Sequence, residues 1–179
     1  MAKQFKQLED KHIDFINNQH MFFVGTACKD GYVNVSPKGM DSFRIINKNQ
    51  VAWLNLTGSG NETAAHILEQ NRMTIMFCSF DKQPLILRLY GSARVLHKKD
   101  KEWEKSATLF PEYIGARQIF EIDLELVQTS CGYAVPFYEL VGERPTLDKW
   151  AISKGQEGIE AYWKEKNIKS LNNKDIDNF

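Results

Sequence analysis

The hydrophobic and polar positions along the chain predict a series of short β-strands, most of them separated by tight turns. Several segments alternate apolar and polar residues, and the Asp30-Gly31 pair between two of them is typical of a hairpin turn. Short strands at regular spacing favour a barrel or a sandwich. The predicted strands span residues 21–28, 32–36, 42–46, 51–56, 73–80, 85–96 and 117–128.

Helical patterns lie mainly at the two ends of the chain. A doubly wound parallel sheet would need a helix after most strands, and most of these helices are missing. The pattern therefore predicts a mainly β fold with flanking helices, of the α+β class. The polar residues 170–179 are expected to form a mobile tail. The predicted helices span about 8–19, 62–71, 99–109 and, with an interruption at Lys154-Gly155, about 146–167.

Length and composition favour one domain over residues 1–179. Lys and Arg number 23, as do Asp and Glu, so the formal net charge is zero and no nucleic-acid partner is expected. The three cysteines are widely spaced, which favours neither a disulfide framework nor a metal site and is consistent with a reducing cytoplasm. No apolar segment approaches the roughly 20 residues of a membrane-spanning helix, so no membrane partner is expected.

A Gly- and Ser-rich loop between a predicted strand and a predicted helix is the first candidate site. It offers free backbone N–H groups and a helix N-terminus to an anion, and the side chains of Thr57, Ser59, Asn61 and Thr63 add donors. The alternative is an ordinary loop in which Ser59 or Asn61 caps the helix. His66, on the same helix, could reach a phosphate or have a structural role.

Two further segments carry cationic side chains in strands. Lys38 follows Ser36 and Pro37 at a strand end, where it could contact a phosphate or an electron-rich ring, or be a solvated turn lysine. Arg88 lies in an apolar strand, so a buried guanidinium there would need an anionic or carbonyl partner. On an alternating strand it could equally face solvent.

Together these segments resemble the pyridoxamine 5'-phosphate oxidase-like, FMN-binding split-barrel family, in a bacterial branch of it. The similarity runs from about Phe22 to beyond Glu143. Each motif alone has low specificity, but four in the same order are fairly specific. The motifs are Val-Ser-Pro-Lys-Gly at 35–39, Leu-Thr-Gly-Ser-Gly-Asn-Glu-Thr-Ala-Ala-His at 56–66, Arg-Leu-Tyr-Gly at 88–91 and Thr-Ser-Cys-Gly-Tyr at 129–133.

The resemblance implies a six-stranded antiparallel split β-barrel and a homodimer with two FMN sites at the subunit interface. It also implies which residues bind the cofactor. Ser36, Pro37 and Lys38 would line the flavin, and the loop and helix start would hold the phosphate. The full set of expected FMN-binding residues is Ser36, Pro37, Lys38, Thr57, Ser59, Asn61, Thr63, His66 and Arg88.

One departure from the family pattern concerns the charge around the phosphate. The better-known oxidases place an Arg-Lys pair at the helix start, where this chain has Thr63 and Ala64 beside Glu62. A phosphate next to a carboxylate requires a cation to neutralise it. The candidates are Lys38, Arg72, Arg88 and Arg117; the alternatives are that FMN binds weakly or that the site prefers another ligand.

The resemblance favours an FMN-dependent oxidoreductase that acts on a small molecule, with NAD(P)H as one plausible electron donor. No catalytic residue is predicted, because the flavin itself carries the redox chemistry. The alternatives are a non-catalytic flavin-binding or flavin-sensing protein, a haem-binding relative with a histidine ligand, and a structural dimer with an empty cleft. The chain has four histidines, His12, His20, His66 and His97.

Overall fold

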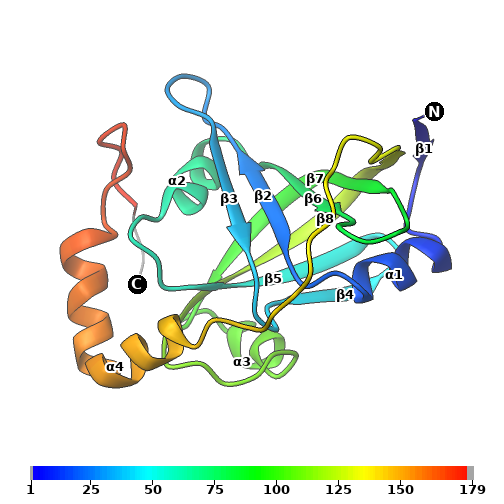
Figure 1. Ribbon diagram of the computed structural model, residues 1–179. Coiled ribbons are helices and arrows are strands. Elements are labelled where there is room, and N and C mark those ends of the chain that lie inside the picture. Colours follow the sequence, from blue (N-terminus) through cyan, green and yellow to red (C-terminus); the bar gives the residue numbers. More distant parts are fainter. Residues whose placement is uncertain (1, 177–179) are drawn as a thin grey trace.

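One antiparallel sheet organises the computed structural model, which describes residues 2–176 (Figure 1). Within these residues the sheet has eight strands, in the order β3-β2-β6-β7-β8-β5-β4, and β1 pairs with β8 outside this sequence of neighbours. The strands are β1 (Lys3–Phe5), β2 (Phe22–Thr26), β3 (Asn34–Lys38), β4 (Phe43–Asn47), β5 (Gln50–Leu56), β6 (Arg72–Cys78), β7 (Ile86–His97) and β8 (Ala116–Ser130).

The predicted mainly β fold with flanking helices is confirmed, whereas the number of strands differs from the six that the resemblance implies. The sheet does not close, because β3 and β4 lie at its two ends. The additional N-terminal strand β1 has no clear alternation in its three residues and gains its order from pairing with Val127–Thr129 of β8. A strand this short is defined by its neighbour more than by its own sequence.

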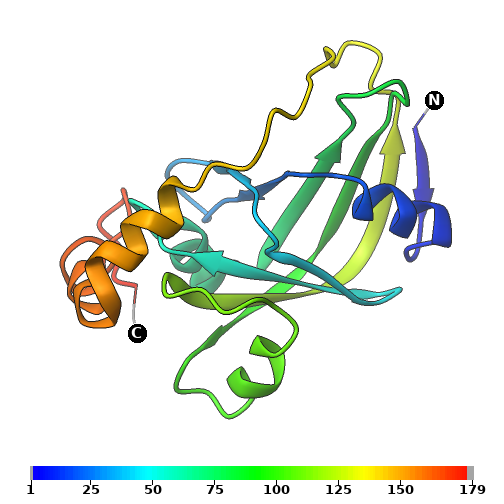
Figure 2. The same ribbon diagram turned by 60° about the horizontal axis from the view of Figure 1, so that its bottom comes forward.

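Four helices flank the sheet, and the figures show α4 extending along one side of it (Figures 1 and 2). Gly155 interrupts α4 with φ 65° and ψ 174°, at the position where the sequence predicts the interruption. A segment without regular structure, residues 131–145, connects β8 to α4 and arches over the sheet (Figure 2). The helices are α1 (Asp10–Asn17), α2 (Glu62–Glu69), α3 (Trp103–Ala107) and α4 (Thr146–Lys166). None of the helices within residues 2–176 is long and apolar enough to cross a membrane.

The main core lies on the inner face of the curved sheet and is rich in aromatic side chains. Trp53 of β5 stacks on Phe120 of β8 with ring centroids 4.9 Å apart and an interplanar angle of 14°. Phe22 of β2 and Phe77 of β6 pack beside them. Successive side chains of a strand point to opposite faces of the sheet, so every second residue of these strands points into the core. The core therefore fixes the positions of β2 and β5, and β3 is held beside the core through its pairing with β2.

The C-terminal segment is more closely attached to the fold than its polar sequence predicts. Ile176 is 3% exposed and packs in the main core. The backbone N–H of Ile176 donates to the carbonyl oxygen of Ile168 at 2.8 Å. A mobile tail is therefore the wrong description for residues 170–176, because one apolar side chain anchors them; residues 177–179 lie outside the described part of the chain.

Gly91 lies at an irregularity between β7 and β8, as its position within a predicted strand suggests. The pairing register shifts between Tyr90 and Gly91. A Cβ atom at Gly91 would lie 2.1 Å from the carbonyl oxygen of Asp123, which is too close for any side chain. The two backbones therefore approach closely because this residue is glycine.

We expect Gly91→Ala to lower the free energy of unfolding by about 1–3 kcal/mol, because the backbone of β8 has to move. Chemical denaturation measures this change. Gly25→Ala is the matched control, since a Cβ atom there would meet its neighbours only at 3.8–3.9 Å. An equal loss in both variants would contradict the close approach at Gly91.

Candidate anion-binding site

A cavity of about 340 Å³ lies where β3, the loop after β5, the start of α2 and the start of β8 meet. We refer to it as the loop pocket. The structure brings five of the nine predicted site residues into it, from two separate segments of the chain. These five residues are Ser36, Lys38, Ser59, Asn61 and Thr63. The pocket is also lined by Asn34, Asn55, Gly58, Gly60, Glu62, Arg117 and Leu171.

The alternation of β3 explains why it contributes every second residue to the pocket. Asn34, Ser36 and Lys38 share one face of the strand and line the loop pocket. Val35 and Pro37 lie on the opposite face and are exposed. The hydroxyl oxygen of Ser36 is buried without a hydrogen-bond partner among the described residues, so it is available to a ligand.

The loop at residues 58–61 presents unused donors to the pocket. Asn61 begins α2 as its N-cap residue, but its side chain makes no capping hydrogen bond. Asn61 is 2% exposed, and neither its amide nitrogen nor its amide oxygen has a partner within the described chain. A buried amide without partners is costly, so this side chain indicates a ligand or an ordered water. Within residues 2–176, no backbone N–H of Gly58, Ser59 or Gly60 is seen to donate to a protein acceptor.

Arg117, at the start of β8, supplies a buried positive charge. Its side chain is 3% exposed, and Nη1 donates to Asn167 Oδ1 at 2.5 Å and to the carbonyl oxygen of Gly60 at 3.2 Å. The Asn55 amide lies 3.0 Å from Nη2 and accepts from it when its oxygen faces the guanidinium. The Nε atom is buried without a partner in the described residues. Burial lowers the pKa of Arg117 to about 10, so the group remains charged at neutral pH.

Lys38 supplies the second positive charge. Its ammonium lies over the ring of Trp53, 4.9 Å from the centroid. Burial, and to a lesser extent the positive charge of Arg117, lowers the pKa of Lys38 to about 8. Glu62 is the carboxylate that lines the pocket, and its Oε1 accepts a hydrogen bond from the backbone N–H of Leu171 at 3.0 Å. Two cations therefore face one carboxylate, and the pocket carries a net positive charge.

Four predicted site residues lie outside the loop pocket. The Thr57 hydroxyl donates to the carbonyl oxygen of Gly115 and accepts from Trp163 Nε1, both at 2.8 Å, so its role is to join segments of the fold. His66 is buried and its Nδ1 lies 3.0 Å from the hydroxyl of Thr26. The other two residues are Pro37, which faces away from the pocket, and Arg88, which is on β7 and donates to Ser130 Oγ.

Among the four cations considered for the phosphate, the structure brings Lys38 and Arg117 into the loop pocket. Arg117 was not among the expected cofactor-binding residues. In the sequence, an arginine before an apolar segment is as consistent with an exposed strand end as with a buried site residue. Its burial depends on Asn167, 50 positions away along the chain, which no local pattern reveals.

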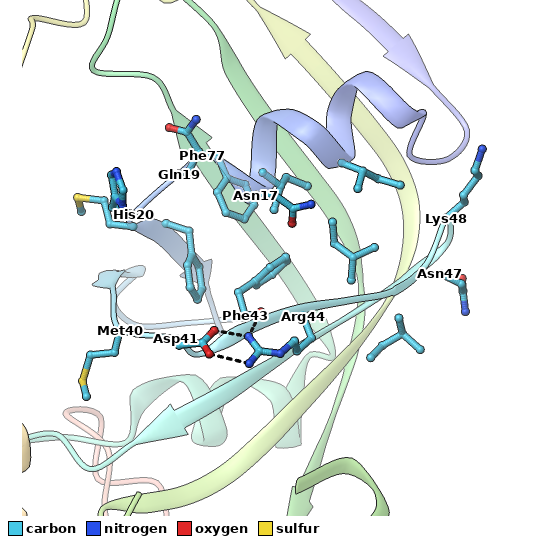
Figure 3. A pocket seen from close by; sticks show the side chains of 16 residues that line it. Asn17, Gln19, His20, Met40, Asp41, Phe43, Arg44, Asn47, Lys48 and Phe77 are labelled. Atoms are coloured by element: carbon cyan, nitrogen blue, oxygen red, sulfur yellow. Dashed lines mark hydrogen bonds and ion pairs between the residues drawn. The ribbon is translucent and has the colours of Figure 1, made fainter. Parts of the chain in front are cut away.

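A second and larger cleft, of about 580 Å³, lies between α1 and β4 (Figure 3). Its arginine already has protein partners. Arg44 forms an ion pair with the neighbouring Asp41 at the edge of this cleft, and its Nε donates to the carbonyl oxygen of Leu109 at 2.6 Å. Among the described residues, no side chain that lines this cleft has a buried polar atom without a hydrogen-bond partner. The loop pocket is therefore the stronger candidate for an anionic ligand.

The haem-binding alternative needs a histidine ligand, so the positions of the histidines matter for it. His12, His66 and His97 are at most 5% exposed, whereas His20 lines the α1–β4 cleft. Within residues 2–176, no group of three or more His, Cys, Asp and Glu side chains is placed to hold a metal ion.

Comparison with protein families identifies the chain. A family model described as Pyridoxamine 5'-phosphate oxidase matches residues 8–131, which is more than half of its length. The chain belongs to this family. The resemblance inferred from the four motifs is thus confirmed. A curated relative, the pyridoxamine 5'-phosphate oxidase family protein ustO of Aspergillus flavus, is 34% identical over 187 aligned positions, which cover 93% of this chain and 74% of that protein.

Solved structures similar to this family member support the fold. A Lactobacillus delbrueckii protein, provisionally described as a pyridoxamine 5'-phosphate oxidase, matches with a TM-score of 0.57 and 18% identity over 69% of this chain and 94% of that one. HupZ of Group A Streptococcus matches with a TM-score of 0.53 and 22% identity over 66% of this chain and 91% of that one. At these identities the likeness concerns the fold alone.

We expect the pKa of Lys38 to appear in the pH dependence of stability of this oxidase-family protein. Between about pH 8 and the unfolded value of about 10.4, the unfolded chain binds more protons, so the free energy of unfolding rises with pH. Lys38→Met removes this group. The variant should be more stable than wild type by about 1–2 kcal/mol at pH 7, since one pKa unit corresponds to about 1.4 kcal/mol and partial solvation reduces the effect.

Urea denaturation in an amine buffer from pH 7 to 10.5 tests this expectation. The difference between Lys38→Met and wild type should shrink as the pH rises through 8. Lys29→Met, at an exposed lysine, is the control and should show no such narrowing. A difference that stays constant over this range would show that burial of Lys38 does not disfavour its charge.

Proposed function

We propose that this chain is a flavoprotein that binds the phosphate of FMN in the loop pocket. The observation that carries the proposal is the convergence of Lys38 and Arg117 on a cavity with unused donors. A phosphate needs both positive charge and several hydrogen-bond donors when it leaves water. The unused donors are Ser36 Oγ, Asn61 Nδ2, Arg117 Nε and the backbone N–H groups of residues 58–60.

The two cations compensate for the Arg-Lys pair that the family's better-known oxidases have at the helix start. Arg117 approaches from β8 and Lys38 from β3, so positive charge comes from strands and not from α2. The Glu62 carboxylate is engaged by the backbone N–H of Leu171, and the two cations outnumber this one negative charge in the pocket. The donor set of this chain therefore fits a phosphate group.

We further propose that the protein is an FMN-dependent oxidoreductase of a small molecule, with NAD(P)H as a candidate electron donor. Bound FMN would supply the redox chemistry, and the protein would bind, orient and electrostatically tune it. Lys38, with a pKa of about 8, is mostly protonated at pH 7 and can donate a hydrogen bond to an electron-rich atom of the ligand.

A homodimer is part of the proposal. A cavity of about 340 Å³ is at the low end for a ligand pocket, so the remaining part of FMN would extend beyond it and need cover from a second copy. Exposed apolar side chains are available for such a contact. They are Tyr32, Val33 and Val35 near β3, and Phe137, Tyr138 and Val141 in the segment before α4. Arg88, on the outer face of β7, would approach a flavin only from the partner.

We expect the purified protein to retain FMN after gel filtration and to elute as a dimer. Arg117→Ala and Lys38→Ala should each weaken FMN binding about 10–100-fold, since a hydrogen bond to a charged group contributes about 1.5–3 kcal/mol. Arg72→Ala, an exposed arginine outside the loop pocket, is the control and should bind as wild type does. The visible absorption spectrum of the eluted protein shows whether FMN is retained, and flavin fluorescence measures the affinity for FMN.

The same spectra separate the alternatives. Retained FMN without oxidation of NADH or NADPH, with several acceptors tried, would favour a non-catalytic flavin-binding protein. A Soret band after incubation with haemin, lost in His20→Ala, would favour the haem-binding alternative. Failure to retain flavin at excess FMN would refute the proposed function.

A further inference from the structure

Asn167 lies just after α4, outside the residues that the family model matches, yet its side chain reaches the loop pocket. The residue is completely buried, with 0% exposure. It follows the last residue of α4 as the C-cap, and its backbone N–H donates to Trp163 at 2.9 Å. The family match ends at residue 131, so this contact comes from the C-terminal segment beyond the matched residues.

The Asn167 amide uses both of its ends at the pocket. Its Oδ1 accepts from Arg117 Nη1 at 2.5 Å. Its Nδ2 lies 3.3 Å from the carbonyl oxygen of Gly58 and 3.4 Å from that of Ser59. Arg117 Nη1 also donates to the carbonyl oxygen of Gly60. Three successive loop carbonyls are therefore held by one asparagine and one arginine.

This arrangement determines what the loop offers to an anion. Carbonyl oxygens carry partial negative charge and would repel a phosphate if they faced it. When donors hold successive carbonyls, these oxygens are engaged, and the backbone N–H groups of the loop remain available to an anion. The N–H groups of Gly58, Ser59 and Gly60 make no hydrogen bond to a protein acceptor within residues 2–176.

Two neighbouring contacts attach the same C-terminal segment to the pocket. Trp163 Nε1, one helical turn before Asn167, donates to Thr57 at the end of β5. The backbone N–H of Leu171 donates to the Glu62 carboxylate. The segment thus contacts the end of the strand, the loop and the first residue of the helix, in the order in which these follow one another.

We propose that Asn167 is a positioning residue for anion binding: it orients Arg117 and the carbonyls of residues 58–60 so that the guanidinium and the loop N–H groups serve the ligand. The C-terminal segment then completes the cofactor site of the same subunit. This inference rests on the proposed function, because the anion is taken to be the phosphate of FMN. Asn167 acts in part through Arg117, so part of its contribution should depend on Arg117.

A double-mutant cycle tests this dependence. The dissociation constant of FMN is measured by quenching of flavin fluorescence for wild type, Asn167→Ala, Arg117→Ala and the double variant. Asn167→Ala should weaken binding about 10-fold, and in the Arg117→Ala background the same change should have a clearly smaller effect, because only the hydrogen bonds to the Gly58 and Ser59 carbonyls remain to be lost. The apparent affinity for inorganic phosphate, as a competitor of FMN, should follow the same pattern.

Two further variants separate a role of Asn167 in FMN binding from a loss of folding. Glu165→Ala, at an exposed residue two positions before Asn167 that pairs with Lys166, should bind FMN as wild type does. Asn167→Asp retains an acceptor for Arg117, and should therefore remain folded, but it neutralises the guanidinium and loses the donor to the loop. It should weaken FMN binding by more than 10-fold with an unchanged elution volume.

The outcomes are distinguishable. If wild type binds FMN and the effects of Asn167→Ala and Arg117→Ala multiply, the role of Asn167 is general stability, and the inference is wrong. Wild-type affinity in Asn167→Asp would also overturn it. If wild type itself does not bind FMN, the proposed function fails before the cycle can be measured.

Discussion

The requirement to stabilise a buried guanidinium links the features of the loop pocket. Removing an arginine from water is costly unless its donors find partners, and Arg117 is almost fully buried. Protein oxygens of Asn167 and Gly60 provide partners for Nη1, while Nε is buried and has none in the described residues. A charge that is held firmly but only partly satisfied is pre-organised for an anion, because the cost of its desolvation has been met during folding.

The position of this charge depends on the sheet. β8 pairs with β7 over most of its length and with β5 on its other side, so the start of β8 is fixed next to the loop that follows β5. The Trp53–Phe120 stack lies between these same two strands and also supports the Lys38 ammonium. The aromatic core and the cationic pocket thus share Trp53, whose ring contacts both Phe120 and the Lys38 ammonium.

The sequence predicts the elements better than it predicts the contacts between them. The irregularity at Gly91 and the interruption of α4 at Gly155 follow from local backbone chemistry and are found where expected. Thr57 and Ser59 have similar hydroxyls in one loop, yet only Ser59 lines the pocket, because Trp163 takes the Thr57 hydroxyl from 106 positions away. Such long-range hydrogen bonds decide which donors remain available, and no local pattern encodes them.

The free edge of the sheet at β3 limits how two copies of the chain can associate. Pro37 is the fourth of the five residues in this edge strand and has no N–H group, so it cannot donate to a strand added alongside. Exposed apolar residues such as Val35 would otherwise make this edge a template for uncontrolled strand addition. The proline thus removes one backbone donor from this edge, which disfavours the addition of a further strand to β3.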